Sequence, residues 1–192
     1  MRYKIKLIEE HHRRMPLLKA LTPGHWYHSY DTATHCQIVI DKADQLATEW
    51  ADAIDGDVLR YAAMAHDWGK LETWRPEGSP WFPNHENKSA DILEEIFETL
   101  TLGTNAPFHE AITTLVRHHG RCQQIDRMGQ KAVNRLLKKL GGNHGYLLEY
   151  FLLLVADCHG FSEEGAKAGY AQAMLFAEAA GLNAEYSALD EL

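Results

Sequence analysis

The sequence predicts an all-α protein, a compact helical bundle, and three observations support this fold class. Alanine and leucine total 46 residues whereas valine and isoleucine total 14, so good helix formers outnumber the β-branched residues that favour strands. Apolar residues recur at three- and four-residue steps, which is the period of an amphipathic helix. Aspartate or glycine stands at the expected ends of several such segments, where these residues start or stop a helix.

The first long helix is predicted from Asp31 to Ile54. Its apolar positions follow the helical period, and Asp31 is suited to cap its N-terminus. A second, short and very apolar helix is expected from about Asp57 to Trp68. Gly69 follows directly and can terminate it.

The rest of the chain continues the helical pattern after an ordered loop. Residues 72–84 hold three of the six prolines and three aromatic residues, which predicts a fixed loop rather than a linker. Pro107 fits the first turn of a helix that stops at Gly120, and the polar residues 121–130 are expected to form a loop. Further helices are predicted at residues 87–100, 131–140, 146–159 and 163–180.

Length, charge and cysteine content restrict the possible functions. A chain of 192 residues is expected to form a single domain over 1–192, with residues 161–192 as a C-terminal helical extension. Its 27 acidic and 19 basic residues give a net charge of −8, which disfavours broad binding to a nucleic-acid backbone but allows a small phosphate ester. With no membrane-length apolar stretch and no secretory signal, a cytoplasmic protein without a membrane partner is expected. Three cysteines without CxxC spacing indicate neither a disulfide framework nor a cysteine zinc site.

Twelve histidines are an unusual number, and several fall at the ends of predicted helices, where metal ligands could meet. Asp157 stands in the apolar run YFLLLVADCHG, where a carboxylate is costly to bury unless it is paired or bound to a metal. For an isolated residue such as His35, a hydrogen bond to the backbone is the simpler explanation. The candidate ligands in chain order are His35, His66, Asp67, His85, His118, His119 and Asp157.

Five sequence blocks give these residues a common explanation. The blocks are HSYDTATH (28–35), MAHDWGK (64–70), NHENKSADIL (84–93), LVRHHG (115–120) and LLLVADCHG (152–160). Their order, a histidine, then His-Asp, then further histidines and an aspartate, resembles the HD superfamily of metal-dependent phosphohydrolases. The resemblance is greatest to the HD domain attached to bacterial tRNA nucleotidyltransferases. It implies a stand-alone HD domain with a motif core at residues 28–160.

The resemblance also implies a metal site between the helices. A first ion would be bound by His35, His66, Asp67 and Asp157. This mixed nitrogen and oxygen set suits Mn, Fe, Co, Ni or Zn better than Mg, which prefers oxygen ligands. Family members with the extra histidines bind a second ion, with the aspartate of the His-Asp pair as a bridge; the matching residues are His85, His118 and His119. One or two such ions would activate water, so that hydroxide rather than a side chain attacks phosphorus.

The two adjacent histidines are not equivalent on a helix. Residues 112, 115, 116 and 119 share an apolar stripe, so periodicity favours His119, whereas the family pattern allows His118 as well. Lys70 resembles the lysine that follows the family's His-Asp-x-Gly and would hold a phosphate oxygen during catalysis. Arg117 and Arg121 bracket the histidine pair and could bind a second phosphate or nucleotide. For Lys70, a solvated charge at the helix end is an equally good interpretation, and for Arg117 and Arg121 a solvated surface charge is slightly favoured.

Other residues of the blocks could support the site. Glu86 is placed to orient His85. His28 and Asp31 match the first block, although a helix cap also explains Asp31. Aromatic residues of the loop at 72–84 are expected to border the site, either stacking on a base or forming a hydrophobic lid; they are Trp74, Trp81 and Phe82.

The resemblance implies a phosphodiesterase or phosphatase that acts on 2′,3′-cyclic nucleotides, small nucleotide phosphates or RNA ends. Gly141 and Gly142 lie between helical segments without a strand-borne pair of aspartates, so nucleotide addition is not expected. Three alternatives remain: a nucleoside mono- or triphosphate phosphohydrolase, a single-stranded DNA nuclease like the HD domain of CRISPR effectors, and a catalytically silent nucleotide-binding module. The acidic balance disfavours the nuclease, and the complete ligand set disfavours the silent module.

Overall fold

Helices form all the regular secondary structure in the part of the chain that the computed structural model describes, residues 2–21, 29–75, 82–100, 106–140 and 144–182. The all-α prediction is therefore confirmed. Within these residues, no helix is both long and apolar enough to cross a membrane. The elements are α1 (Arg2–Leu18), α2 (Thr32–Glu49), α3 (Gly56–Ala65), α4 (Lys70–Thr73), α5 (His85–Thr99), α6 (Ala106–His118), the 3₁₀ helix η1 (His119–Arg127), α7 (Gln130–Lys139), α8 (His144–His159) and α9 (Glu163–Ala180).

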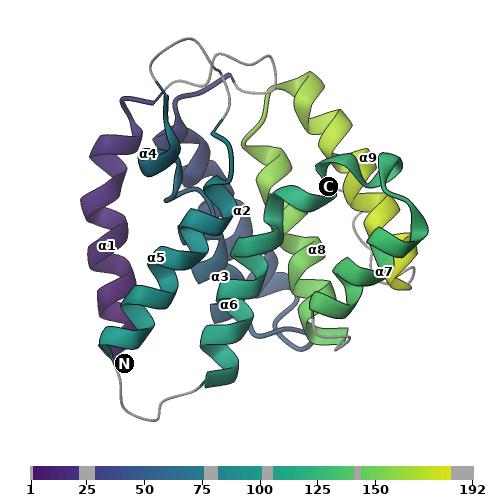
Figure 1. Ribbon diagram of the computed structural model, residues 1–192, viewed down its shortest axis with the longest axis horizontal. Helices are drawn as coiled ribbons and strands as arrows, with labels where there is room; N and C mark the ends of the chain where they lie inside the picture. Colours follow the sequence, from purple (N-terminus) through teal and green to yellow (C-terminus); the bar gives the residue numbers. More distant parts are fainter. Residues whose placement is uncertain (1, 22–28, 76–81, 101–105, 141–143, 183–192) are drawn as a thin grey trace.

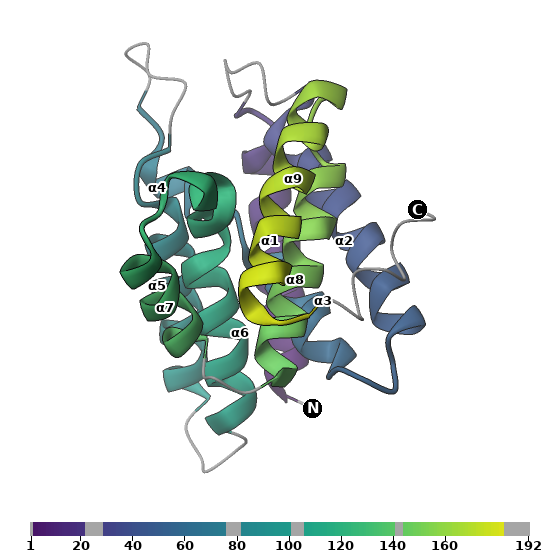
Figure 2. The ribbon, with the colours of Figure 1, turned by 90° about the vertical axis from the view of Figure 1, so that its right-hand side faces the viewer.

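The helices form two sides that meet along a shared interior (Figure 1). In the orthogonal view of Figure 2, α5, α6 and α7 lie on one side, and α2, α3, α8 and α9 on the other. Contacts of α6 with α3 and α8 join the two sides, while α1 packs against α2, α3, α4 and α5. Segments far apart in the sequence are thereby brought together at the helix ends.

The central helix of the core is α8, which contacts α2, α3, α6, α9 and η1. A helix that is apolar around its whole circumference is stable only when other elements surround it. The run from Tyr150 to Ala156 fits this description, because each of its side chains is buried. Asp157 follows the run directly, so the fold carries its carboxylate into the interior.

Helix boundaries and one loop differ from the sequence predictions. Helix α2 ends at Glu49 rather than at Ile54, and α3 ends at Ala65, after which the chain turns before the short α4. The segment expected to be a loop after Gly120 is largely the 3₁₀ helix η1. Its backbone is interrupted by non-helical angles at Gln124, and its buried residues are spaced by three positions, which a search for the α-helical period misses; they are His119, Cys122 and Ile125.

Helix α1 is the element that the apolar pattern did not predict. Its buried side chains are Leu7, His11, Arg14 and Leu18, which lie on one face at three- and four-residue steps. Two of these four residues are polar, so a count of apolar residues misses the stripe. The helix is therefore held in part by polar contacts, in which Arg14 has the largest share.

Candidate metal centre

Each of four histidine rings is fixed in a single orientation by a hydrogen bond to a backbone carbonyl group. The Nδ1 atoms of His66, His85 and His119 lie 2.7, 2.8 and 2.7 Å from the carbonyl oxygen three residues earlier in the chain. His35 Nδ1 lies 2.9 Å from the carbonyl oxygen of Gly160, which is distant in sequence. Because a carbonyl oxygen only accepts, each Nδ1 carries the proton. Every neutral ring therefore presents a lone pair at Nε2.

The four Nε2 atoms meet in two pairs. His35 Nε2 is 3.2 Å from His66 Nε2, and His85 Nε2 is 3.3 Å from His119 Nε2. In the neutral rings these lone pairs face each other, which is unfavourable unless a proton or a metal cation lies between them. Two nitrogens that each lie about 2.1 Å from one ion are about 3.0–3.4 Å apart. Both pairs thus have the spacing of ligands that share an ion.

Asp67 lies between the two histidine pairs. Its Oδ2 atom is 3.5 Å from His35 Nε2 and 3.3 Å from His66 Nε2. Its Oδ1 atom is 3.2 Å from His85 Nε2 and 3.8 Å from His119 Nε2. Each oxygen of this buried carboxylate therefore faces a different pair, which is the arrangement of a carboxylate that bridges two ions.

Asp157 completes the first group. Its Oδ1 atom lies 3.1 Å from His35 Nε2 and 3.7 Å from His66 Nε2. Two adjacent sets of buried or half-buried donor atoms result, which share no residue: His35 with His66 and Asp157, and Asp67 with His85 and His119. Imidazole nitrogens combined with carboxylate oxygens fit a divalent transition ion, so the residues present match the metal that the sequence predicts.

The cluster forms because helix ends converge. His35 lies in the first turn of α2, His85 begins α5, and His119 begins η1. His66 is the C-cap residue of α3, and Asp67 follows it in the turn before α4. Helix ends leave backbone carbonyls without partners inside the helix, and these carbonyls orient His66 and His119 at the ends of α3 and α6.

Charge within the cluster offsets burial. Burial disfavours the charged form of Asp67, but Lys70 and His66 outweigh this effect and hold its pKa well below the usual range. The pKa of Asp157 is lowered in the same way, against its burial, by the neighbouring histidines. For His119, burial together with the other histidines lowers the pKa to about 4. Near neutral pH, both carboxylates are charged and His119 is neutral, which are the forms that bind a metal.

A comparison with models of protein families supports the type of fold that this geometry indicates. A model of the HD domain family matches residues 26–140, more than half of the chain. The chain belongs to the HD domain family. The superfamily consists of metal-dependent phosphohydrolases, and the His-Asp cluster is compatible with its metal site. No curated protein sequence matches the chain at a significant level. Asp157 lies beyond the matched residues, and its place beside the cluster comes from the geometry alone.

Lys70 is a buried cation beside the cluster of this HD domain. Its side chain is buried, and Nζ lies 2.6 Å from Asp67 Oδ2 and 5.3 Å from the centre of the Phe82 ring. Burial lowers the pKa of Lys70, but the Asp67 charge outweighs burial and raises it. Asp67 Oδ2 nevertheless has no hydrogen bond of good geometry among the described residues. A buried acceptor without such a bond is suited to a metal ion.

Two glycines of the HD domain allow the close approaches on which the cluster depends. A Cβ atom on Gly160 would lie 2.2 Å from His35 Nδ1, the atom that donates to the Gly160 carbonyl. A Cβ atom on Gly69 would lie 2.3 Å from the carbonyl oxygen of His85. Real Cβ atoms do not approach so closely, so a side chain at either position would push a ligand away.

The structure separates His119 from its neighbour His118. His118 is buried, yet it belongs to neither donor set, and its Nδ1 atom has no hydrogen-bond partner in the described residues. Burial, together with the nearby charges of Lys139, Arg121 and Arg117, lowers its pKa to about 4. The geometry therefore places His119, which the helical period favours, in a donor set and leaves His118 outside both sets.

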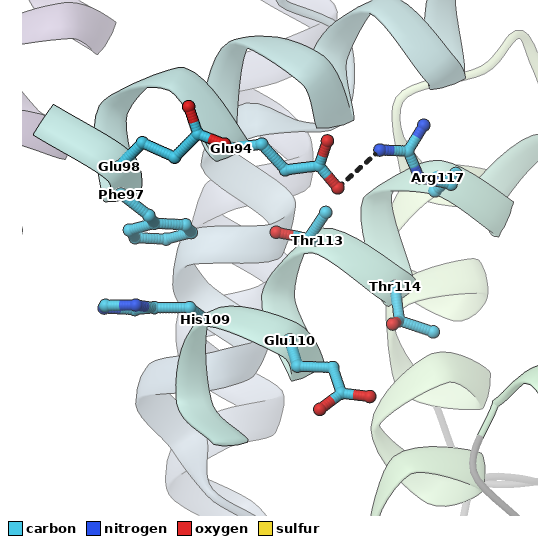
Figure 3. A pocket seen from close by; sticks show the side chains of 8 residues that line it. All are labelled: Glu94, Phe97, Glu98, His109, Glu110, Thr113, Thr114 and Arg117. Carbon is cyan, nitrogen blue, oxygen red and sulfur yellow. Dashed lines mark hydrogen bonds and ion pairs between the residues drawn. The ribbon is translucent and has the colours of Figure 1, made fainter. Parts of the chain in front are cut away.

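Among the described residues, neither predicted phosphate-binding arginine forms an ion pair with a residue of the donor sets. Arg117 forms ion pairs with Asp91, at 3.1 Å, and with Glu94, at 2.7 Å, both on α5. It lines a groove of about 520 Å³ between α5 and α6, where Figure 3 shows its guanidinium directed at Glu94. Arg121 is exposed on η1. The cation that the structure places against the cluster is Lys70.

The remaining predicted residues divide between caps and orienting groups. Asp31 caps α2 by accepting a hydrogen bond from the Thr34 backbone N–H, so its cap role is the one observed. Glu86 Oε2 lies 3.6 Å from His85 Nδ1, but that proton is directed to the Phe82 carbonyl at 2.8 Å. His28 and Trp81 lie outside the described residues. Trp74 is largely exposed at the end of α4.

The orienting carbonyls were missed by the sequence analysis. The carbonyls of Ala63, Phe82 and Val116 all stand three residues before a histidine ligand, a spacing that could have indicated them. The carbonyl of Gly160 had no such signal, since its partner is in another helix. Cys36 is fully buried close to His66 and Asp67, where burial raises its thiol pKa and keeps it protonated.

Proposed function

We propose that this HD domain hydrolyses phosphate esters of small nucleotides or RNA ends, with 2′,3′-cyclic nucleotides as the leading substrates. The proposal includes a requirement for one or two divalent transition ions. It is carried by one observation: four histidine Nε2 atoms, each with its other nitrogen protonated, converge on the two oxygens of Asp67. Such an arrangement concentrates electron pairs in a buried space and is stable with positive charge inside it.

The residues would divide the work as follows. One ion would be held by His35, His66, Asp157 and Oδ2 of Asp67, and a second by His85, His119 and Oδ1 of Asp67. A divalent ion in such a site supplies Lewis acidity, which lowers the pKa of water and offsets negative charge on phosphoryl oxygens. The backbone carbonyls keep the imidazoles in their ligand tautomer, and Lys70 would hold a phosphate oxygen with its ammonium group.

The choice of a small substrate rests on charge and on sequence resemblance. A net charge of −8 disfavours a long polyanionic strand, whereas the binding of a single phosphate depends on the local cations. The likeness of the five sequence blocks to the HD domain attached to tRNA nucleotidyltransferases favours a 2′,3′-cyclic phosphate among small esters.

The test is a matrix of metals and substrates with the purified protein. The metals are Mn²⁺, Co²⁺, Ni²⁺, Fe²⁺, Zn²⁺ and Mg²⁺, and the substrates are 2′,3′-cyclic nucleotides, nucleoside mono- and triphosphates, and single-stranded DNA. The expected result is turnover of a cyclic nucleotide with a transition ion, abolished in Asp67→Asn and retained in Asp126→Asn. Asp126 is a suitable control because it is an exposed acid on η1, outside both donor sets.

Other outcomes would replace parts of the proposal. Activity with Mg²⁺ alone would contradict the transition-metal assignment. Turnover of only mono- or triphosphates would change the substrate class, and salt-sensitive cutting of single-stranded DNA would identify a nuclease. Nucleotide binding without any hydrolysis would identify a silent binding module.

A further inference from the structure

Arg14 of α1 is bound to the turn that carries the metal-binding His-Asp pair. Its Nη1 atom donates to the Trp68 carbonyl oxygen at 3.1 Å and to Glu72 Oε1 at 2.8 Å. Its Nε atom donates to Glu10 Oε1, one turn earlier in α1. The side chain is only 6% exposed. A guanidinium is seldom buried to this extent unless several acceptors compensate for the lost water, and here three do.

The two distant acceptors belong to the segment that positions Asp67. Trp68 follows Asp67 in the turn between α3 and α4, and Glu72 lies in α4, which begins at Lys70. In this turn the N–H groups of Trp68 and Lys70 each donate to a carbonyl three residues earlier, and the Gly69 N–H donates to Ser89 Oγ of α5 at 2.8 Å. Arg14 thus bonds the chain on both sides of Lys70, at Trp68 and at Glu72. Lys70 in turn contacts Asp67.

The surroundings of Arg14 provide no substitute for it. Its guanidinium lies 6.0 Å from the centre of the Trp68 ring, and the His11 ring lies 6.5 Å from the same ring. His11 is buried, and burial together with the charge of His12 lowers its pKa, which favours the neutral form. In this buried contact between α1 and the turn, Arg14 is the cation that bonds the Trp68 carbonyl.

We infer that Arg14 is a positioning residue for the metal centre: it fixes the turn after α3 so that the Asp67 oxygens face their two histidine pairs. The inference rests on the metal centre of the proposed function. Helix α1 precedes residues 26–140, which the family model matches, so this contact joins the matched HD region to a helix outside it. Groups that orient a metal ligand from outside the coordination shell commonly change metal affinity by about 10- to 100-fold.

The experiment compares metal affinity in variants of Arg14 and Arg13. Both arginines bond Glu10, but Arg13 is 60% exposed and does not reach the turn, so Arg13→Met is a matched control. Mn²⁺ or Co²⁺ is titrated calorimetrically into the metal-free full chain. Arg14→Met is expected to weaken binding about 10- to 100-fold and to alter the visible spectrum of the Co²⁺ form. Arg14→Lys should recover part of the affinity, and Arg13→Met should bind as the wild type does.

Two further measurements separate positioning from simple loss of stability. Thermal unfolding of each variant is recorded without metal and with saturating metal. If Arg14→Met does not fold, Glu72→Gln serves as a milder change at the same contact. Wild-type affinity in folded Arg14→Met, or in Glu72→Gln if Arg14→Met does not fold, with only the metal-free unfolding temperature lowered, would overturn the inference. If the wild type itself binds no metal, the metal centre is wrong and the inference falls with it; if only phosphate-ester hydrolysis is missing, the proposed function fails while the inference stands.

Discussion

Lys70 Nζ lies 2.6 Å from Oδ2 of Asp67, the oxygen that also faces His35 and His66. Both partners of this ion pair are buried, so each charge depends on the other. The ammonium group therefore has two effects on the centre. It keeps Asp67 ionised, and in the proposed function it would also bind a phosphate oxygen.

Replacement of Lys70 tests its proposed role in phosphate binding. Lys70→Met is expected to retain metal binding, because the donor atoms remain, but to lower kcat by about 100-fold, a typical result of removing one charge-stabilising donor. Steady-state kinetics with the best metal and substrate pair measure the change. Lys131→Met, at an exposed position of α7, should leave kcat unaltered. An unchanged kcat in Lys70→Met would remove Lys70 from the catalytic role.

Gly160 is expected to tolerate no side chain. Gly160→Ala would place Cβ against the His35 ring, 2.2 Å from Nδ1, so the ring must move or the helix end must shift. Metal affinity should fall by about 10- to 100-fold, as for loss of an orienting group. Gly129→Ala is the matched control, since a Cβ there meets nothing within 4 Å. Calorimetric titration of both variants gives the comparison, and equal affinities would contradict the close approach.

Glu149 is expected to make stability depend on pH. Its Oε1 accepts the Asp55 N–H at 2.9 Å, while Oε2 is buried without a hydrogen-bond partner among the described residues, and burial raises the pKa to about 7. A raised folded-state pKa gives stability that is complete below the ordinary value of 4.5 and is lost as the pH rises through about 7. The free energy of unfolding should fall by roughly 3 kcal/mol over this window.

Glu149→Gln removes the titrating group and should flatten this part of the pH profile. The measurement is urea unfolding of metal-free wild type and variant between pH 4.5 and 8. The difference between the two proteins should grow in favour of the variant as the pH rises. A difference that stays constant with pH would show that Glu149 is already ionised in the folded protein.

The sequence predicted those parts of the fold that depend on local patterns. The helical period located α2, α5, α6, α8 and α9, and the cap at Asp31 was recognised because Asp31 bonds a neighbouring N–H. Helix α1 escaped because its buried stripe includes His11 and Arg14, whose partners lie in a distant turn. Burial of a polar residue depends on what the fold brings beside it, and that information is absent from hydrophobic periodicity.

The same distinction applies to the site. Residue types and block order selected His35, His66, Asp67, His85 and Asp157, and the helical period selected His119 over its neighbour. The tautomers and the division of Asp67 between two histidine pairs required coordinates, because they depend on carbonyls such as that of Gly160. Arg117 shows the converse case, because it is next to His118 in the sequence but forms its ion pairs with acidic residues of α5.

The most direct test of the central claim is calorimetric titration of Mn²⁺, Co²⁺ or Ni²⁺ into the metal-free wild type and Asp67→Asn. Because both Asp67 oxygens face histidine pairs, the wild type is expected to bind up to two ions per chain, and Asp67→Asn is expected to lose most of that binding. Asp126→Asn should match the wild type. A wild type that binds no transition ion, or an Asp67→Asn variant that binds as tightly, would contradict the account.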